Sequence, residues 1–340
     1  MALSIRSAGY AVIAFAVACT PAPQTIETKH TSHSFKDAPK QAGRDTVAVL
    51  TPLEAETKEL WSALVLELKD DFNVVTVPVD RATTARNLGL ELDELVPNCV
   101  VVVDNRTLQL YRELQARRPG RTFPPAVVVM TSFLDGTIRG LRSAMGIAYE
   151  VPAVSGVVAL REVSTTDIKR VGVVHRQNFT NLVHAQAELL AVEKVQLVPG
   201  SLKNTPTPEE IEDSLDDLVV SQNVDALWVL NDNRLLTPEL LMSSWLPVLR
   251  FKPIPVIVGI SALVHPDVHF GTLAVFPNHA RLGVQAANLV FDLYDNDWQL
   301  VEQAQVDLPL SVNTVVDVAI VDDYFGLKAD ALSKIDQAVK

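Results

Sequence analysis

The polar residues of this chain that could do chemistry follow its short apolar runs. In the first half of the chain, hydroxyl, carboxyl and amide side chains come directly after such runs at Thr51, Asp104, Asn105, Thr131 and Ser132. If the runs are parallel strands, their carboxyl ends meet at one edge of a sheet, which is where ligands bind in open α/β sheets. These hydrogen-bonding groups therefore predict a binding site for a small molecule.

A second set of strand-end residues occurs in the other half of the chain. It adds one aromatic ring to further hydrogen-bonding groups, and its members are His175, Asn178, Asp232, Asn233, Ser261, Phe276 and Asn278, with Gln177 and Asn231 beside them. Two lobes that face each other through these edges would form a cleft. Asp, Asn, Ser and Thr after strands also cap helices and make turns, and for each single residue that alternative stays open. For the whole set, we predict a binding cleft.

No catalytic motif favours an enzyme. The chain has no Gly-x-Gly-x-x-Gly after an apolar run, no Gly-rich phosphate loop ending in Lys-Ser or Lys-Thr, and no Gly-x-Ser-x-Gly elbow. His265 and His269 stand four residues apart with Asp267 between them, a spacing that could bind a metal ion on a helix. Pro266 and the neighbouring apolar run favour a loop there instead. We therefore expect no enzyme activity, no metal and no cofactor.

The net charge of the chain argues against nucleic acid as a partner. The formal net charge is −12 at pH 7, which argues against a nucleic-acid-binding protein, because such proteins usually carry a basic face. Arg106, Arg176 and Arg234 lie beside the strand-end residues and could pair with a ligand carboxylate, or they could equally be solvated.

The first residues predict export. Met1 to Arg6 carries one positive charge, and the apolar stretch 8–18 is shorter than the roughly 20 residues that a membrane-spanning helix needs. Ala16 and Ala18 precede Cys19, and small residues before a Cys resemble the bacterial lipobox, in which the Cys becomes the lipidated first residue. We expect a signal peptide over 1–18 and a lipidated Cys19 that anchors the protein on the periplasmic or cell-surface side. An ordinary secretory signal with an incidental Cys19 is the alternative.

The composition after Cys19 separates a tether from a folded body. Residues 20–44 are rich in Thr, Pro, Ser, Lys and Gln, with Ile26 and Phe35 as their only large apolar residues. Such a segment cannot bury enough apolar surface to order itself, so we expect a flexible tether over 19–44. Cys99 begins the apolar run Cys-Val-Val-Val-Val and is expected to be a buried strand thiol rather than a nucleophile.

From Asp45 onward, short apolar runs alternate with segments of helical period. Helices are expected over 54–68, 208–220 and 280–293, and strands buried on both faces over 46–50, 74–79, 99–103, 126–130, 170–174, 195–199, 226–230, 255–260 and 272–276. The alternation predicts βαβ units and an α/β fold. The pattern runs twice, and each pass ends a central run with Asp-Asn-Arg, at residues 104–106 and 232–234. That match suggests a repeated supersecondary unit.

Residues from about 126 to 327 resemble the substrate-binding proteins of one ABC-transporter family, a group that includes tryptophan- and tyrosine-binding members. The resemblance is carried by the segments 168–175, 224–233, 253–261, 271–276 and 318–327. It implies a periplasmic-binding-protein type I-like fold, in which two Rossmann-like lobes with parallel sheets are joined by hinge strands. Lobe one is then expected over 45–150 with about 277–308, and lobe two over 151–276 with about 309–340.

The chain departs from this family at positions that face the ligand. The family's Tyr-Asn-Pro after the first strand of lobe two is replaced by His175 to Asn178, and the usual aspartate and tyrosine after Phe276 give way to Pro277-Asn278. The family's hinge Thr-Gly is replaced around residues 145–149. These departures indicate a different ligand or a loss of binding.

The resulting hypothesis is an extracytoplasmic solute-binding lipoprotein that serves an ABC importer. Its partners would be a small amino acid-like or other polar or aromatic solute, an ABC permease and, through the anchor, the membrane. Phe276 would stack on the ligand, while Asp104 and Asp232 would accept hydrogen bonds from its amine or hydroxyl groups. A ligand-sensing or protein-interaction lipoprotein that keeps the fold without transport is the alternative. An enzyme with His175 as its base is a third and weaker hypothesis.

Overall fold

The computed structural model describes residues 41–339, except residues 53, 266, 269 and 301. The predicted signal peptide, the lipidated Cys19 and most of the predicted tether lie outside these residues. Among the helices of the described part of the chain, none is both long and apolar enough to cross a membrane.

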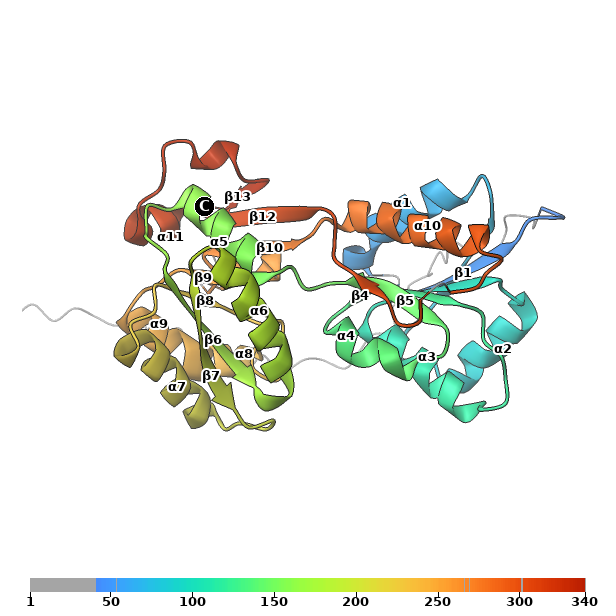
Figure 1. The fold of residues 1–340 in the computed structure, drawn as a ribbon, viewed down its shortest axis with the longest axis horizontal. Helices are drawn as coiled ribbons and strands as arrows, with labels where there is room; N and C mark the ends of the chain where they lie inside the picture. The colour runs from blue at the N-terminus through green and yellow to red at the C-terminus, as the bar shows by residue number, and fades with distance from the viewer. Residues whose placement is uncertain (1–40, 53, 266, 269, 301, 340) are drawn as a thin grey trace, which may run out of the picture. The chain divides into compact units, whose positions relative to one another are not determined.

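The first lobe is built on a six-stranded parallel sheet with the order β11-β5-β4-β3-β1-β2. Its strands are β1 (Thr46–Thr51), β2 (Asn73–Pro78), β3 (Cys99–Val103), β4 (Ala126–Thr131), β5 (Ala144–Ala148) and β11 (Val306–Asp307). Its longer helices are α1 (Lys58–Leu68), α2 (Ala85–Leu95), α3 (Asn105–Arg117) and α10 (His279–Asp295), with the short α4 (Leu134–Thr137) after β4. Figure 1 shows α1 and α10 on one face of this sheet and α2 and α3 on the other.

Alternation along each strand divides the core of the first lobe between its two faces. Val47 and Val49 of β1 pack in the cluster that α1 and α10 cover, whereas Ala48 and Leu50 pack in the cluster beneath α2 and α3. Cys99 is fully buried at the start of β3, as expected for a strand thiol, and this burial raises the pKa of the thiol to about 12.

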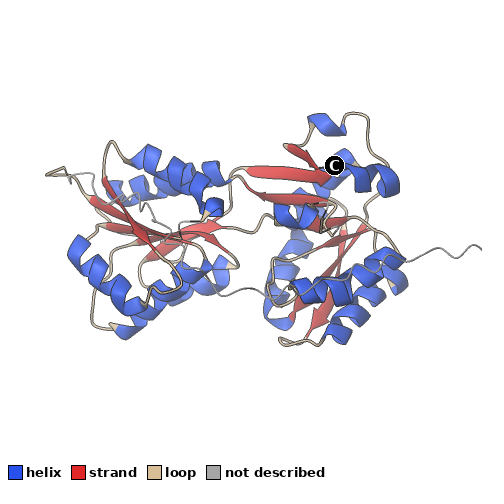
Figure 2. Ribbon diagram, turned by 180° about the vertical axis from the view of Figure 1, so that it is seen from behind, coloured by secondary structure: helices blue, strands red, loops and turns tan. Residues whose placement is uncertain are grey.

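The second lobe is built on a seven-stranded sheet with the order β13-β12-β10-β9-β8-β6-β7. Its strands are β6 (Arg170–Arg176), β7 (Gln196–Leu202), β8 (Ala226–Trp228), β9 (Val256–Val258), β10 (Leu273–Pro277), β12 (Val312–Asp317) and β13 (Gln337–Val339). Only the β10–β12 pair of this sheet is antiparallel within the described residues. Figure 2 shows helices on both faces of each sheet.

The helices of the second lobe also divide between two clusters. α5 (Ala153–Val163) and α6 (Thr180–Val192) cover one face, and α7 (Pro208–Asp216) and α9 (Leu246–Phe251) cover the other. α7 begins as the sequence predicts: Thr207 caps it with a reciprocal bond to Glu210, and Pro208 is its first residue. The short helices α8 (Pro238–Leu240) and α11 (Val318–Ile320) complete the lobe, together with single turns of 3-10 and π-helix.

The two lobes repeat one strand order. β2-β1-β3-β4-β5 in the first sheet corresponds to β7-β6-β8-β9-β10 in the second, and at the same side β11 follows in the first and β12 and β13 follow in the second. This confirms the α/β class and the two Rossmann-like lobes of a periplasmic-binding-protein type I-like fold. The described chain passes between the sheets after β5, after β10 and after β11.

Two strands of the first sheet, β5 and the two-residue β11, were not among the predicted runs. β5 contains Gly146, and a Cβ there would lie 2.4 Å from the carbonyl oxygen of Val128 in the neighbouring β4. Close approach of the two backbones therefore requires glycine. The resulting small-residue composition of β5 hides it from a search for Val- and Ile-rich runs.

A second close approach generates a prediction about stability. A Cβ on Gly283 of α10 would lie 2.3 Å from the carbonyl oxygen of Leu60 in α1, so Gly283→Ala should force these helices apart and lower the free energy of unfolding by about 1–3 kcal/mol. Gly136→Ala on α4 is the matched control, because nothing lies within 4 Å of an added Cβ there and alanine favours helix. Urea unfolding measures both variants. Equal stability of the two would contradict the packing constraint.

Candidate functional site

The strand ends of the first lobe bring two of the predicted residues together. The backbone N–H of Ser132, after β4, donates to Oδ1 of Asn105, after β3, at 3.1 Å. Thr51 and Thr131 lie at the ends of β1 and β4, but both are buried and their hydroxyls donate to the nearby carbonyls of Pro52 and Val129. Asn105 and Ser132 thus form the accessible part of this edge, and the two threonines support it from within.

Asp104 combines a structural bond with an unusual environment. Its side chain caps α3 by accepting from the N–H of Thr107 at 2.7 Å, and its φ of 79° is left-handed. Burial raises the pKa of this carboxyl, and the carboxylate of Glu54 raises it further against the bonds from Thr107. Asp104 therefore gains from any positive charge that approaches it.

The corresponding residue of the second lobe, Asp232, is already paired. Arg176 at the end of β6 donates from Nε to Oδ2 at 2.6 Å and from Nη2 to Oδ1 at 2.9 Å, and both residues are buried. Oδ1 also accepts from the N–H of Arg234. Asp232 and Arg176 are thus bonded to each other in this structure, and the expectation that Asp232 accepts a hydrogen bond from a ligand stays a prediction. A bidentate buried pair holds the ends of β6 and β8 together.

The side chains of Arg176, Phe179 and Phe133 form a stack that reaches from this ion pair to the other lobe. The guanidinium of Arg176 lies 5.1 Å from the ring centre of Phe179. Phe179 stacks in turn on Phe133, with ring centres 4.1 Å apart and planes inclined by 34°. Phe133 follows β4 of the first lobe, where its φ is 55°. The aromatic pair therefore joins the strand-end loops of the two lobes.

The other predicted residues of the second lobe divide into buried and exposed groups. His175 is buried, with Nδ1 3.0 Å from the carbonyl oxygen of Arg176. The side chains of Asn178, Asn233 and Ser261 are exposed. Asn178 donates its backbone N–H to Oδ1 of Asn204, at the end of the adjacent strand β7.

Asn278 and Phe276 lie where the chain crosses after β10. Asn278 caps α10: its side-chain oxygen accepts from the N–H of Arg281, and its amide nitrogen donates to Oδ1 of Asn313. It is thus a helix cap, the alternative to ligand binding that the sequence analysis gave for such residues. Phe276 packs edge-on against His279, with ring centres 6.1 Å apart. Nε2 of His279 lies 3.0 Å from the hydroxyl of Tyr149 in the crossing after β5. Burial lowers the pKa of His279 and raises that of Tyr149 to about 12.

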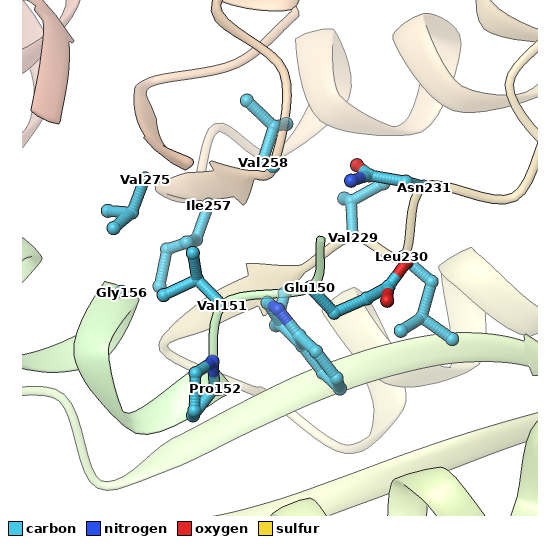
Figure 3. A pocket seen from close by; sticks show the side chains of 12 residues that line it. Glu150, Val151, Pro152, Gly156, Val229, Leu230, Asn231, Ile257, Val258 and Val275 are labelled. Atoms are coloured by element: carbon cyan, nitrogen blue, oxygen red, sulfur yellow. The ribbon is translucent and has the colours of Figure 1, made fainter. Parts of the chain in front are cut away.

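Of the residues around a pocket at the ends of β8 and β9, sequence reasoning had named only Asn231 as a candidate binding residue. It is lined by the crossing residues Glu150, Val151 and Pro152, by Gly156 of α5, and by Trp228, Val229, Leu230, Asn231, Ile257, Val258, Gly259 and Val275. Its cavity volume is ≈ 20 Å³, which is room for about one water-sized group below the open mouth. Figure 3 shows its side-chain oxygens on Glu150 and Asn231 and an apolar wall of Val151, Ile257 and Val275 opposite.

Glu150 is the unexpected member of this pocket. Its Oε1 accepts from the backbone N–H of Phe133 at 2.9 Å, which ties the crossing to the stacked aromatic pair. Burial raises the pKa of Glu150 to about 7, and the carboxylate of Asp135 adds to the effect. A search for polar residues after strands would have found Glu150 if β5 had been recognised, since it stands two residues beyond that strand.

The raised pKa of Glu150 predicts a pH-dependent stability. A carboxyl whose folded pKa exceeds its unfolded value stabilises the fold at low pH and loses that contribution as pH rises through the folded pKa, here about 7. Relative to the wild type, Glu150→Gln should therefore gain about 1–3 kcal/mol in the free energy of unfolding between about pH 5 and pH 8. Urea unfolding at each pH measures the difference. Glu188→Gln on exposed α6 should show no such trend, and a flat profile for Glu150→Gln would refute the assignment.

Comparison with known proteins bears on the fold. No protein-family model and no curated protein sequence matches the chain. Among solved structures, a ligand-free substrate-binding protein with adhesive properties from Clostridium difficile is similar with a TM-score of 0.63 and 14% identity, covering 87% of this chain and 100% of that one.

Two further structures agree with that likeness. A conserved domain protein from Vibrio cholerae has a TM-score of 0.54 and 15% identity over 86% of this chain and 99% of its own. An ABC domain from Streptococcus pneumonia in complex with L-Trp has a TM-score of 0.53 and 16% identity over 87% of this chain and 100% of its own. At these identities the comparisons establish the fold alone, which this chain shares with that substrate-binding protein and with the L-Trp-bound ABC domain.

Proposed function

We propose that the chain is an extracytoplasmic solute-binding lipoprotein that holds a small molecule between its lobes and presents it to an ABC importer. The observation that carries the proposal is the repeated strand order, because it directs the carboxyl ends of both sheets toward the segments that connect the lobes. Ligands of open α/β sheets bind at such ends. The proposal includes no catalytic step.

Hinge closure is the proposed mechanism. Few covalent connections join the lobes, so small changes in the backbone angles of residues 149–152, 278 and 308–311 suffice to move one lobe against the other. A ligand that contacts both edges stabilises the closed form by its higher affinity for that form. The proposed contacts are Asn105 and Ser132 with Asp104 from the first lobe, and Asn178, Asn233, Ser261 and Phe276 from the second.

An interaction or sensing role is the second candidate, and one observation favours it. The ion pair of Arg176 with Asp232 and the stack of Phe179 on Phe133 fill part of the region between the strand ends with the protein's own side chains. A protein that keeps the fold without transport would have this arrangement. Neighbouring permease and ATPase genes would favour import, and a neighbouring histidine kinase gene would favour sensing.

The ligand-binding role predicts stabilisation by a solute. The full chain should be screened by thermal shift against amino acids, amines, nucleosides, sugars and short peptides. A ligand at about 100 times its dissociation constant should add roughly 2.7 kcal/mol of stability, which raises the melting temperature by several degrees.

Matched variants decide whether a hit uses the strand-end edges. Asn233→Ala changes an exposed side chain and should weaken binding of the hit without lowering the melting temperature of the free protein. Asn105→Ala should weaken binding as well, and its melting temperature should fall because the N–H of Ser132 loses its acceptor. Glu188→Gln, on the outer surface of α6, is the control. A well-folded chain that no solute stabilises would move the assignment to the interaction or sensing role.

The proposed lipid anchor predicts that membrane association of the protein depends on Cys19. In a bacterial host, wild-type protein should partition with membranes and incorporate labelled fatty acid, because lipid chains add about 0.8 kcal/mol of membrane affinity per buried methylene. Cys19→Ser should leave the protein soluble in the extracytoplasmic fraction and unlabelled. Cys99→Ser is the control, since Cys99 is buried in β3. Membrane retention of the Cys19 variant would refute the anchor.

A further inference from the structure

The pocket beside the crossing after β5 contains two acceptors on one side. Glu150 contributes a carboxyl, and the N–H of Phe133 donates to only one of its two oxygens. Asn231, three residues after the end of β8, contributes an amide. Its Oδ1 is buried and has no hydrogen-bond partner in the described part of the chain. Figure 3 shows both side chains on the side of the pocket opposite Val151 and Val275.

The position of Asn231 depends on a glycine in the next strand end. A Cβ on Gly259 would lie 2.6 Å from Nδ2 and 2.7 Å from Oδ1 of Asn231. Gly259 therefore leaves the space in which the amide lies against the end of β9, at the edge of the pocket. A buried amide oxygen without a donor destabilises the protein, so a donor from outside the chain would remove that destabilisation.

The charges around the pocket favour one type of donor. Among the residues that the structure describes, no basic side chain pairs with Glu150, and the charged neighbour that shifts its titration is another acid, Asp135. The buried guanidinium of Arg176 is already bonded to Asp232. An ionised carboxylate in such a place is costly unless a cation pairs with it.

We propose that this pocket binds a primary ammonium group of the solute, which is about the size of a water molecule, between the carboxylate of Glu150 and the side-chain oxygen of Asn231. Such a group has several N–H donors and so satisfies both acceptors at once. The carbon atoms next to the nitrogen pack on Val151, Ile257 and Val275. The inference rests on the proposed ligand-binding function and gives it a substrate class: cationic amines, with or without an attached ring.

Binding of a cation here is linked to protons. Glu150 titrates near neutral pH because it is buried, and only its ionised form pairs with the ligand. The titratable groups whose charges reach it are Asp135 after β4 and Tyr149 beside it in the chain. Asp135 is exposed and Tyr149 has a raised pKa, so Glu150 is the group that changes charge near neutrality. Affinity for the cation falls as pH drops below about 7.

The test compares amines with matched acids on the full chain. Tryptamine, phenethylamine, agmatine and putrescine are the amine probes, and indole propionate and phenylpropionate are the carboxylate counterparts of the first two. We expect calorimetric binding of at least one amine at about pH 8, weakening about tenfold per pH unit below 7, because one proton must leave Glu150. Neither acid should bind.

Variants separate the pocket from the rest of the site. Glu150→Gln should weaken amine binding at least tenfold and abolish its pH dependence, while its own melting temperature at high pH stays at or above that of the wild type. Asn231→Ala should weaken binding severalfold, and Glu188→Gln should leave it unchanged. Unaltered affinity in Glu150→Gln overturns the pocket assignment.

The remaining outcomes distinguish this inference from the proposed function. If a solute without an amine stabilises the chain and Glu150→Gln binds it equally well, the substrate class is wrong and ligand binding stands. If neither the amines nor the broader solute set binds a well-folded chain, the ligand-binding function fails and the inference fails with it.

Discussion

Parallel strand pairing constrains both lobes in the same way. Each strand must start at the same edge as its neighbour, so a helix returns the chain across one face, and the strand interiors become buried on both sides. Polar side chains can then collect only where strands end. All of the described crossings between the lobes leave from the carboxyl end of a parallel strand, namely β5, β10 or β11. The direction of the strands therefore places the polar edges, the crossings and the pocket of Glu150 in one region.

Among the described residues, the buried carboxyl groups in this region have a cationic partner in the second lobe and none in the first lobe or the crossing. In the second lobe, Asp232 has a bidentate partner in Arg176, so its negative charge is neutralised inside the protein. In the first lobe and the crossing, Asp104 and Glu150 have raised pKa values because burial is not offset by a cation. A buried pair stabilises little by itself and is costly to break, which suits a rigid strut. An unpaired carboxyl retains its affinity for a positive charge, which suits a site for an incoming group.

The sequence was informative where a property depends on neighbours along the chain, and less so where it depends on distant contacts. Runs of Val and Ile predicted the central strands, and Thr207 with Pro208 predicted the start of α7. β5 was missed because its backbone packs against β4 through Gly146, which removes the apolar bulk that marks a strand. The pairing of Asp232 with a residue 56 positions earlier could not be read from its own surroundings. The same holds for Phe133 and Phe179, which meet only once both lobes are formed.

The crossings have a consequence for the order in which the protein can fold. α10 covers one face of the first sheet, yet it follows β10 of the second lobe in the chain. During synthesis from the N-terminus, the cluster of Val47, Val49 and Val101 is therefore covered by α1 alone until residues 279–295 are available. The sheet of the second lobe is also incomplete at that point, because β12 and β13 follow α10 in the chain. The first lobe therefore cannot be completed until most of the second lobe has been synthesised, and the two cores become complete close together, near the end of the chain.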